Sequence, residues 1–129
     1  MKSNKIVLSF FVLAFLGCKD SPISTSEFST ATFSYVARDT VGTVVTTGTL
    51  VLYNNNSEIT GNWNFDDGRF GDLEGRIDKD SMALNLNPGV KDSNLFLQGR
   101  LFANMYFGEW IMYGWGILGR GSFIATRKL

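Results

Sequence analysis

The stretch EITGNWNFDDGRFGDLEGRI, residues 58–77, decides the fold class of this 129-residue chain. On both sides of the central Asp66-Asp67-Gly68, apolar residues or glycines occupy every second position, and polar residues occupy most of the others. A period of two is typical of a β-strand with one buried face, whereas a helix repeats its apolar residues every three or four positions. Aspartate and glycine favour tight turns. The stretch therefore predicts two antiparallel strands joined by a short turn.

The same alternation continues through residues 30–129, and no helical stripe is sustained. Breaks rich in Asn, Asp, Gly or Pro divide it into segments, and we expect strands at 31–38, 43–53, 58–65, 70–77, 82–86, 94–102, 105–113 and 118–127. Eight short strands joined in sequence by tight turns favour a single all-β domain, an up-and-down antiparallel β-barrel, because closure removes the sheet edges that invite aggregation. An open sheet or a sandwich would show the same periodicity.

Parity along each strand predicts which side chains fill the barrel. The expected inward row is Ile59, Trp63, Phe65, Leu73, Ile77, Met82, Leu84, Leu86, Leu95, Leu97, Leu101, Phe123 and Ala125. Glycine recurs two places before a large apolar residue, at Gly61, Gly75, Gly99, Gly108 and Gly121. Since glycine weakens a strand, this repeat needs a cause. It lets the strands coil sharply into a narrow barrel, or it leaves space for a ligand.

The first 17 residues have the pattern of a secretory signal peptide. Two lysines precede an apolar run at 6–16 that only Ser9 interrupts. This run is too short for a permanent membrane-spanning helix. The next motif, Phe15-Leu16-Gly17-Cys18, resembles the lipobox of bacterial lipoproteins. The resemblance implies that Cys18 is diacylated and that the chain is cleaved on its amino side.

Residues 18–29 are rich in Ser and Thr, a composition that is typical of a flexible tether because it cannot bury enough apolar surface to order itself. Within it, Lys19-Asp20-Ser21 resembles the short charged tether of Bacteroidota-type lipoproteins, although a solvated linker would look the same. The expected organisation is a signal peptide at 1–17, a lipidated tether at 18–29 and a barrel at 30–129. Its lipid would make the membrane a partner and would anchor the chain in the cell envelope, at the outer membrane, facing the periplasm or the surface.

Composition excludes several kinds of site. The chain has no histidine and its one cysteine is Cys18, so disulfides, Cys/His zinc sites and imidazole-based catalysis cannot form in the mature chain. Without the two lysines of the signal peptide, ten basic residues stand against twelve acidic ones, and the arginines are scattered singly. Nucleic-acid binding needs clustered cations. We therefore expect no nucleic-acid partner.

The carboxylates indicate neither a metal site nor an active site. The aspartates gather at turns, and no calcium-binding loop with alternating ligands is present. Glu74 and Glu109 could face each other as the carboxylate pair of a glycosidase does, but no motif flanks them. We expect a protein without a metal or other cofactor and without enzymatic activity.

The segment Gly61-Asn62-Trp63 resembles the Gly-x-Trp motif of calycins, the superfamily of lipocalins, fatty-acid-binding proteins and avidins. The resemblance implies a barrel in which Trp63 packs on a late-strand arginine, here Arg120 or Arg127. Our first hypothesis is a barrel that holds a small apolar or amphipathic ligand between its glycine-lined interior and two tryptophans. The candidate ligand-binding residues are Gly61, Trp63, Gly75, Gly99, Trp110 and Phe123.

A second hypothesis places function on the outside of the barrel. The segment 105–115 is apolar at both parities, whereas a strand with one buried face should alternate more cleanly. Its outward residues must therefore be covered, for example by Phe28 of the tether, or exposed as a patch. Exposed aromatic side chains anchor many protein interfaces. The chain would then be a protein-interaction or inhibitor module whose surface comprises Phe107, Ile111, Tyr113 and Trp115.

Overall fold

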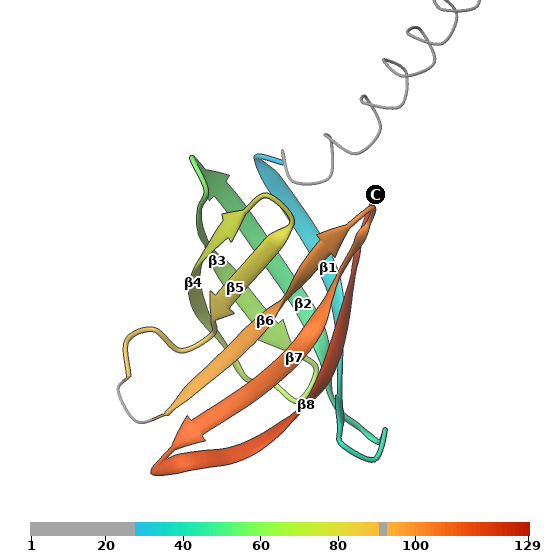
Figure 1. Cartoon of the computed structure of the whole chain (residues 1–129), viewed down its shortest axis with the longest axis vertical. Coiled ribbons are helices and arrows are strands. Elements are labelled where there is room, and N and C mark those ends of the chain that lie inside the picture. The colour runs from blue at the N-terminus through green and yellow to red at the C-terminus, as the bar shows by residue number, and fades with distance from the viewer. Residues whose placement is uncertain (1–27, 91–92) are drawn as a thin grey trace, which may run out of the picture.

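A computed structural model describes residues 28–90 and 93–129 of the chain (Figure 1). The predicted signal peptide, the predicted lipid attachment at Cys18 and the tether up to residue 27 lie outside the described residues.

The described residues form one closed antiparallel barrel. Its strands are β1 (Thr30–Asp39), β2 (Val44–Asn55), β3 (Glu58–Phe65), β4 (Phe70–Asp78), β5 (Ser81–Asn85), β6 (Asn94–Phe102), β7 (Met105–Gly114) and β8 (Gly116–Arg127). Each strand pairs with the next along the chain, and β8 pairs with β1 to close the barrel. The predicted up-and-down barrel is confirmed, and every strand begins and ends within two residues of its predicted bounds.

The two ends of the barrel differ (Figure 1). At one end, here called the closed end, two-residue turns join β2 to β3, β4 to β5 and β6 to β7. In the first of these turns Asn56 and Ser57 have positive φ angles of 53° and 75°, the conformation that suits the twist of paired strands. The opposite end, here called the mouth, carries the longer β1–β2, β3–β4 and β5–β6 connections and the β7–β8 turn at Trp115. The mouth is therefore the less tightly sealed end.

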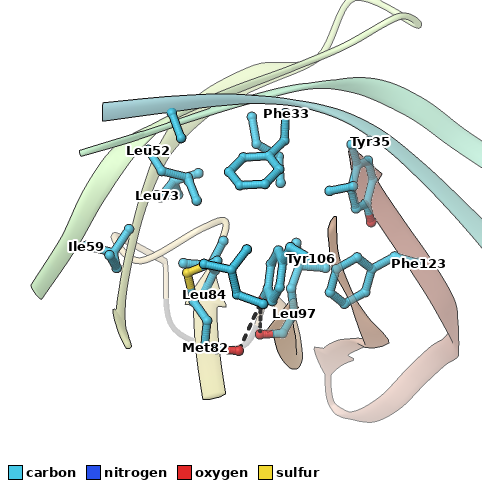
Figure 2. Packing of buried hydrophobic residues seen from close by; sticks show 14 of the residues in the cluster. Phe33, Tyr35, Leu52, Ile59, Leu73, Met82, Leu84, Leu97, Tyr106 and Phe123 are labelled. Atoms are coloured by element: carbon cyan, nitrogen blue, oxygen red, sulfur yellow. Dashed lines mark hydrogen bonds between the residues drawn. The ribbon is translucent and has the colours of Figure 1, made fainter. Parts of the chain in front are cut away.

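The inward row predicted from parity fills the barrel, most of it fully buried, with Trp63 and Leu95 partly buried (Figure 2). The Tyr106 hydroxyl lies 3.0 Å from the Met82 carbonyl oxygen and 3.2 Å from that of Leu97, and it donates to them inside the core. The Tyr106 ring packs edge-on against another inward aromatic ring at 4.8 Å between centroids. The interior toward the closed end is therefore a packed core.

Phe28 belongs to the barrel, and its assignment to the tether is corrected by the structure. Its side chain is buried in the core cluster, and the Arg127 guanidinium lies 6.0 Å from its ring centroid. The next residue, Ser29, accepts a hydrogen bond from the Asn54 amide with its carbonyl oxygen. Because Phe28 precedes β1 at the closed end, it packs against the core there and does not cover the outer face of β7. The packed domain thus includes Phe28.

The repeated glycines lie where neighbouring strands press together. A Cβ on Gly99 would overlap the Phe107 carbonyl oxygen, and a Cβ on Gly108 would overlap that of Gln98. The other members of the repeat that meet neighbouring backbone in this way are Gly61, Gly75 and Gly121. The space beside these glycines is filled by backbone, which supports the curvature explanation of the repeat.

Replacing Gly99 with alanine is expected to lower the free energy of unfolding by about 1–3 kcal/mol, the usual cost of overpacking, because the methyl group must displace the β7 backbone. Urea unfolding of residues 19–129, followed by tryptophan fluorescence, would measure the change. Gly89→Ala is the matched control, because a Cβ there meets nothing within 4 Å. A Gly99→Ala protein as stable as the control would contradict this close packing.

Two buried tyrosines predict a loss of stability at high pH. Burial raises the pKa of Tyr106 well above its usual range, and burial also raises the pKa of Tyr35. These side chains ionise more readily in the unfolded chain, so the free energy of unfolding should be unaffected by them below pH about 10 and should fall above it. Denaturant unfolding between about pH 8 and pH 11 would measure the fall. Tyr106→Phe should show a shallower fall, and an equal fall in both proteins would refute this cause.

Candidate functional site

Two neighbouring cavities open at the mouth of the barrel. The larger measures about 470 Å³ and lies beside β3, the start of β4 and the segment after β5, and the smaller measures about 220 Å³ and lies between β1, β2, β7 and β8. Four residues line both of them, namely Phe65, Arg69, Leu95 and Met112. The cavities are thus two chambers of one site, here called the mouth site.

Trp63 forms a wall of the larger chamber at a gap in the barrel. The ladder between β4 and β5 runs only from Glu74 to Asp78 of β4, which leaves the first residues of β4 outside it. The Trp63 indole Nε1 spans this gap, because it donates to the Leu86 carbonyl oxygen at 2.6 Å and to that of Asp72 at 3.0 Å. Trp63 also lines an outer depression of about 740 Å³. Trp63 therefore separates the mouth site from the outer surface.

Trp110 has an equivalent position in the smaller chamber. Its Nε1 donates to the Arg38 carbonyl oxygen at 2.7 Å, and its ring lies 3.3 Å from where a Cβ of Gly119 would stand. The Trp63 ring likewise lies 3.0 Å from where a Cβ of Gly71 would stand. Each indole ring thus packs against a glycine of the next strand, and its N–H donates a hydrogen bond to a backbone carbonyl oxygen. The indoles therefore offer apolar surface to the site.

Two β-bulges aim extra apolar side chains over the smaller chamber. The β1–β2 ladder shifts register after Ala37, and Val45 is its extra residue. The β7–β8 ladder shifts after Met112, and Leu118 is its extra residue. Val45 and Leu118 both line the smaller chamber, yet they stay 48% and 66% exposed. Since bulges redirect side chains and often lie beside functional sites, these two residues form apolar lips of the mouth site.

Arg69 is the one charged residue among the described residues that line the two chambers. Its Nε lies 2.9 Å and its Nη2 lies 2.8 Å from Oδ2 of Asp67, and its guanidinium lies 5.3 Å from the Phe65 ring centroid. Hydrogen bonding to Arg69 lowers the pKa of Asp67, so the carboxylate is ionised at neutral pH. The sequence gives no hint of this role, because a single arginine in a turn has no diagnostic pattern.

Tyr35 forms the floor of the smaller chamber. Its ring stacks on Phe65 with 5.5 Å between centroids and 6° between planes. Among the described residues, the Tyr35 hydroxyl has no hydrogen-bond partner. Every fully buried side-chain polar atom in those residues does have one, so the Tyr35 hydroxyl is not fully buried. The hydroxyl must therefore face the open chamber that Tyr35 lines. Burial raises the pKa of Tyr35 and the charge of Arg69 lowers it less strongly, so the hydroxyl stays protonated and can donate.

The structure brings some predicted ligand-binding residues together and separates others. Trp63 and Trp110 both line the mouth site, one in each chamber. Phe123 is buried among the core aromatic rings and lines neither chamber. The predicted residues that face neighbouring backbone instead are Gly61, Gly75 and Gly99. The two chambers therefore lie beside the tryptophans, and Gly61 borders only the outer depression.

The outward residues of β7 do not form one exposed strip. Ile111 is only 8% exposed, beside its cross-strand partner Arg120. Phe107 and Tyr113 are moderately exposed, and Tyr113 packs edge-on against a β6 aromatic ring. Trp115, in the β7–β8 turn, is 96% exposed. Of the four predicted surface residues, Trp115 thus offers most of the area, and it lies at the mouth.

The late-strand arginines lie away from Trp63, which corrects the calycin-like expectation. Arg120 points outward, where its Nη2 lies 2.6 Å from Oε2 of Glu109. Arg127 lies over Phe28 at the closed end. The indole of Trp63 is held by backbone carbonyl oxygens instead.

The predicted carboxylates do not form a facing pair. Glu74 is on β4 and Glu109 is on β7, which are not neighbours in the barrel. Across residues 28–90 and 93–129, no group of three or more Asp, Glu, Cys or His residues is placed to hold a metal ion. In the same residues no helix is long and apolar enough to cross a membrane. Comparisons of the chain with protein-family models, curated proteins and solved structures found no match.

Proposed function

We propose that the chain is a lipid-anchored, non-enzymatic protein of the cell envelope whose barrel binds a small amphipathic molecule at the mouth site. The observation that carries this proposal is the pair of neighbouring chambers, which share four lining residues and are walled by aromatic and aliphatic side chains, above an otherwise packed interior. Small-molecule sites have this composition, with mostly apolar walls and a few polar groups that fix the orientation of the ligand.

The dimensions of the mouth site limit the ligand. Its chambers measure about 470 and 220 Å³, within or near the range of about 300–1,000 Å³ that is typical of small-ligand sites. Beneath the floor formed by Tyr35 lies Phe123, with 5.9 Å between the two ring centroids. A long acyl chain therefore finds no path along the barrel axis. A compact molecule with two or three rings fits the space better.

A protein-interaction module is the second candidate, and Trp115 is the observation that favours it. Together with Ile117 and Leu118, it exposes apolar surface at the tip of the β7–β8 hairpin. A protruding tryptophan is the kind of side chain that a partner buries as an anchor. Trp115 lines neither chamber, so replacing it would separate the two candidate functions, although Leu118 belongs to both surfaces.

Native mass spectrometry tests the first candidate. Residues 19–129 would be exported by the native host without the lipobox cysteine and purified without detergent. We expect an added mass of a small molecule that is lost on denaturation. Met112→Trp, which fills space shared by both chambers, should carry no such mass. A wild-type protein free of added mass would count against a bound ligand and would direct the search to Trp115.

Lipid anchoring is tested at Cys18. Full-length protein in a host that processes lipoproteins should incorporate labelled palmitate and sediment with membranes, because two or three acyl chains anchor a protein stably. Cys18→Ser should lose both properties, since a serine hydroxyl does not replace the thiol as the acceptor of the diacylglycerol. Membrane sedimentation that survives Cys18→Ser would show another mode of attachment.

A further inference from the structure

This inference rests on the proposed function and names the chemical class of the ligand. We infer that Arg69 and Tyr35 bind an oxyanion of the ligand, so that the mouth site selects compact apolar molecules that carry a carboxylate, sulfonate or similar group.

The first argument is the distribution of charge in the mouth site. The chambers are lined by aromatic, aliphatic, amide and hydroxyl side chains, and Arg69 is the one ionised side chain among their described lining residues. Arg69 also lines both chambers. A ligand in either chamber thus meets one ionised hydrogen-bond donor, paired with Asp67, within largely apolar walls. Charge-assisted hydrogen bonds are among the strongest polar contacts available to such a ligand.

The second argument is the way in which Arg69 is held. Asp67 accepts hydrogen bonds from the Nε and Nη2 atoms of Arg69 with one carboxylate oxygen, Oδ2. Its other oxygen, Oδ1, accepts from the Arg69 backbone amide at 3.1 Å. A guanidinium has five N–H donors, so the Nη1 atom of Arg69 keeps donors for a ligand. Asp67 and the Phe65 ring thus fix the orientation of the guanidinium while part of it stays available.

The third argument is the second donor, Tyr35. Its hydroxyl faces the smaller chamber and lacks a partner in the described residues. Arg69 lines the same chamber, so one ligand held there can meet both groups. Tyr35 is a neutral donor at physiological pH, because burial raises its pKa. A hydroxyl donor beside a guanidinium is suited to an oxyanion and gives no advantage to a cation.

The apolar part of the ligand would occupy the rest of the smaller chamber. Trp110 and Met112 form one side of it, and the bulge residues Val45 and Leu118 stand at its opening. Because both bulge side chains are largely exposed, they can close over a bound molecule and bury apolar surface of their own. The oxyanion would then lie between Arg69 and the Tyr35 hydroxyl.

Two fluorescent dyes that differ by one group test this inference. Anilinonaphthalene sulfonate carries a sulfonate, and N-phenylnaphthylamine is the same apolar skeleton without it. With residues 19–129, which contain the whole barrel, we expect the sulfonate dye to bind more tightly than the neutral dye. Arg69→Gln should weaken the sulfonate dye about tenfold, and Arg69→Lys should weaken it less. Both variants should change the affinity for the neutral dye much less than the affinity for the sulfonate dye.

Arg100→Gln is the matched control. Arg100 is an exposed arginine that pairs with Asp80 at 2.7 Å at the closed end, so its replacement removes the same charge and an equivalent ion pair far from the mouth site. It should change neither affinity. Tyr35→Phe should weaken the sulfonate dye alone, by a few-fold. Unfolding midpoints of all variants would show that the barrel is intact.

Different results would overturn the proposed function and the oxyanion inference. Absence of saturable binding for both dyes would overturn the proposed function. Saturable binding of both dyes with equal affinity, unaltered by Arg69→Gln, would overturn the oxyanion inference and leave the apolar site standing. A loss of sulfonate-dye affinity in Arg100→Gln as large as in Arg69→Gln would also overturn it, because net charge rather than Arg69 would then be responsible.

Discussion

Closure of the barrel depends on backbone contact at glycine. Gly99 and Gly108 are partners in the β6–β7 ladder, and a methyl group on either would overlap a carbonyl oxygen of the other strand. A barrel of eight strands is narrow, so its strands must coil strongly, and residues without a side chain permit that approach on the concave face. The large apolar residues, placed two positions away, then meet across the axis. The radius set by the glycines thus determines how much of the interior can be filled.

A narrow barrel leaves room for a ligand only where the inward row of side chains stops. Toward the closed end, large residues such as Phe33 and Tyr106 are fully buried in the core. Toward the mouth, the strands end unevenly, since β5 has 5 residues and β8 has 12. Trp63 closes the side that the short β5 leaves open, and the bulges interrupt the alternation beside it. The mouth site therefore arises from unequal strands and bulges, and not from the glycine repeat.

The fold could be predicted from the sequence because a period of two places both the strand and its buried face. Trp63 and Trp110 could be placed beside the site for the same reason. Val45 and Leu118 could not, because a bulge depends on the pairing of two strands and not on local sequence. Arg69 meets Phe65 only once the β3–β4 turn has formed. Phe28 has a polar surrounding sequence, and its burial depends on the core side chains that it meets at the closed end once the barrel has formed.

The two ends of the barrel also determine how the mouth site is presented. The described chain begins with Phe28 at the closed end, so the proposed lipid on Cys18 would attach on the side away from the mouth (Figure 1). Residues 19–27 could span at most about 30 Å when fully extended, and a tilted twelve-residue strand has an axial length of roughly 30 Å. A mouth turned toward the membrane would therefore require this segment to be almost fully extended along the barrel. The mouth, with Arg69 and Trp115, would thus face the aqueous space. A compact molecule with an ionised group is soluble there, whereas a membrane lipid is not, so the position of the anchor and the charge of Arg69 favour the same class of ligand.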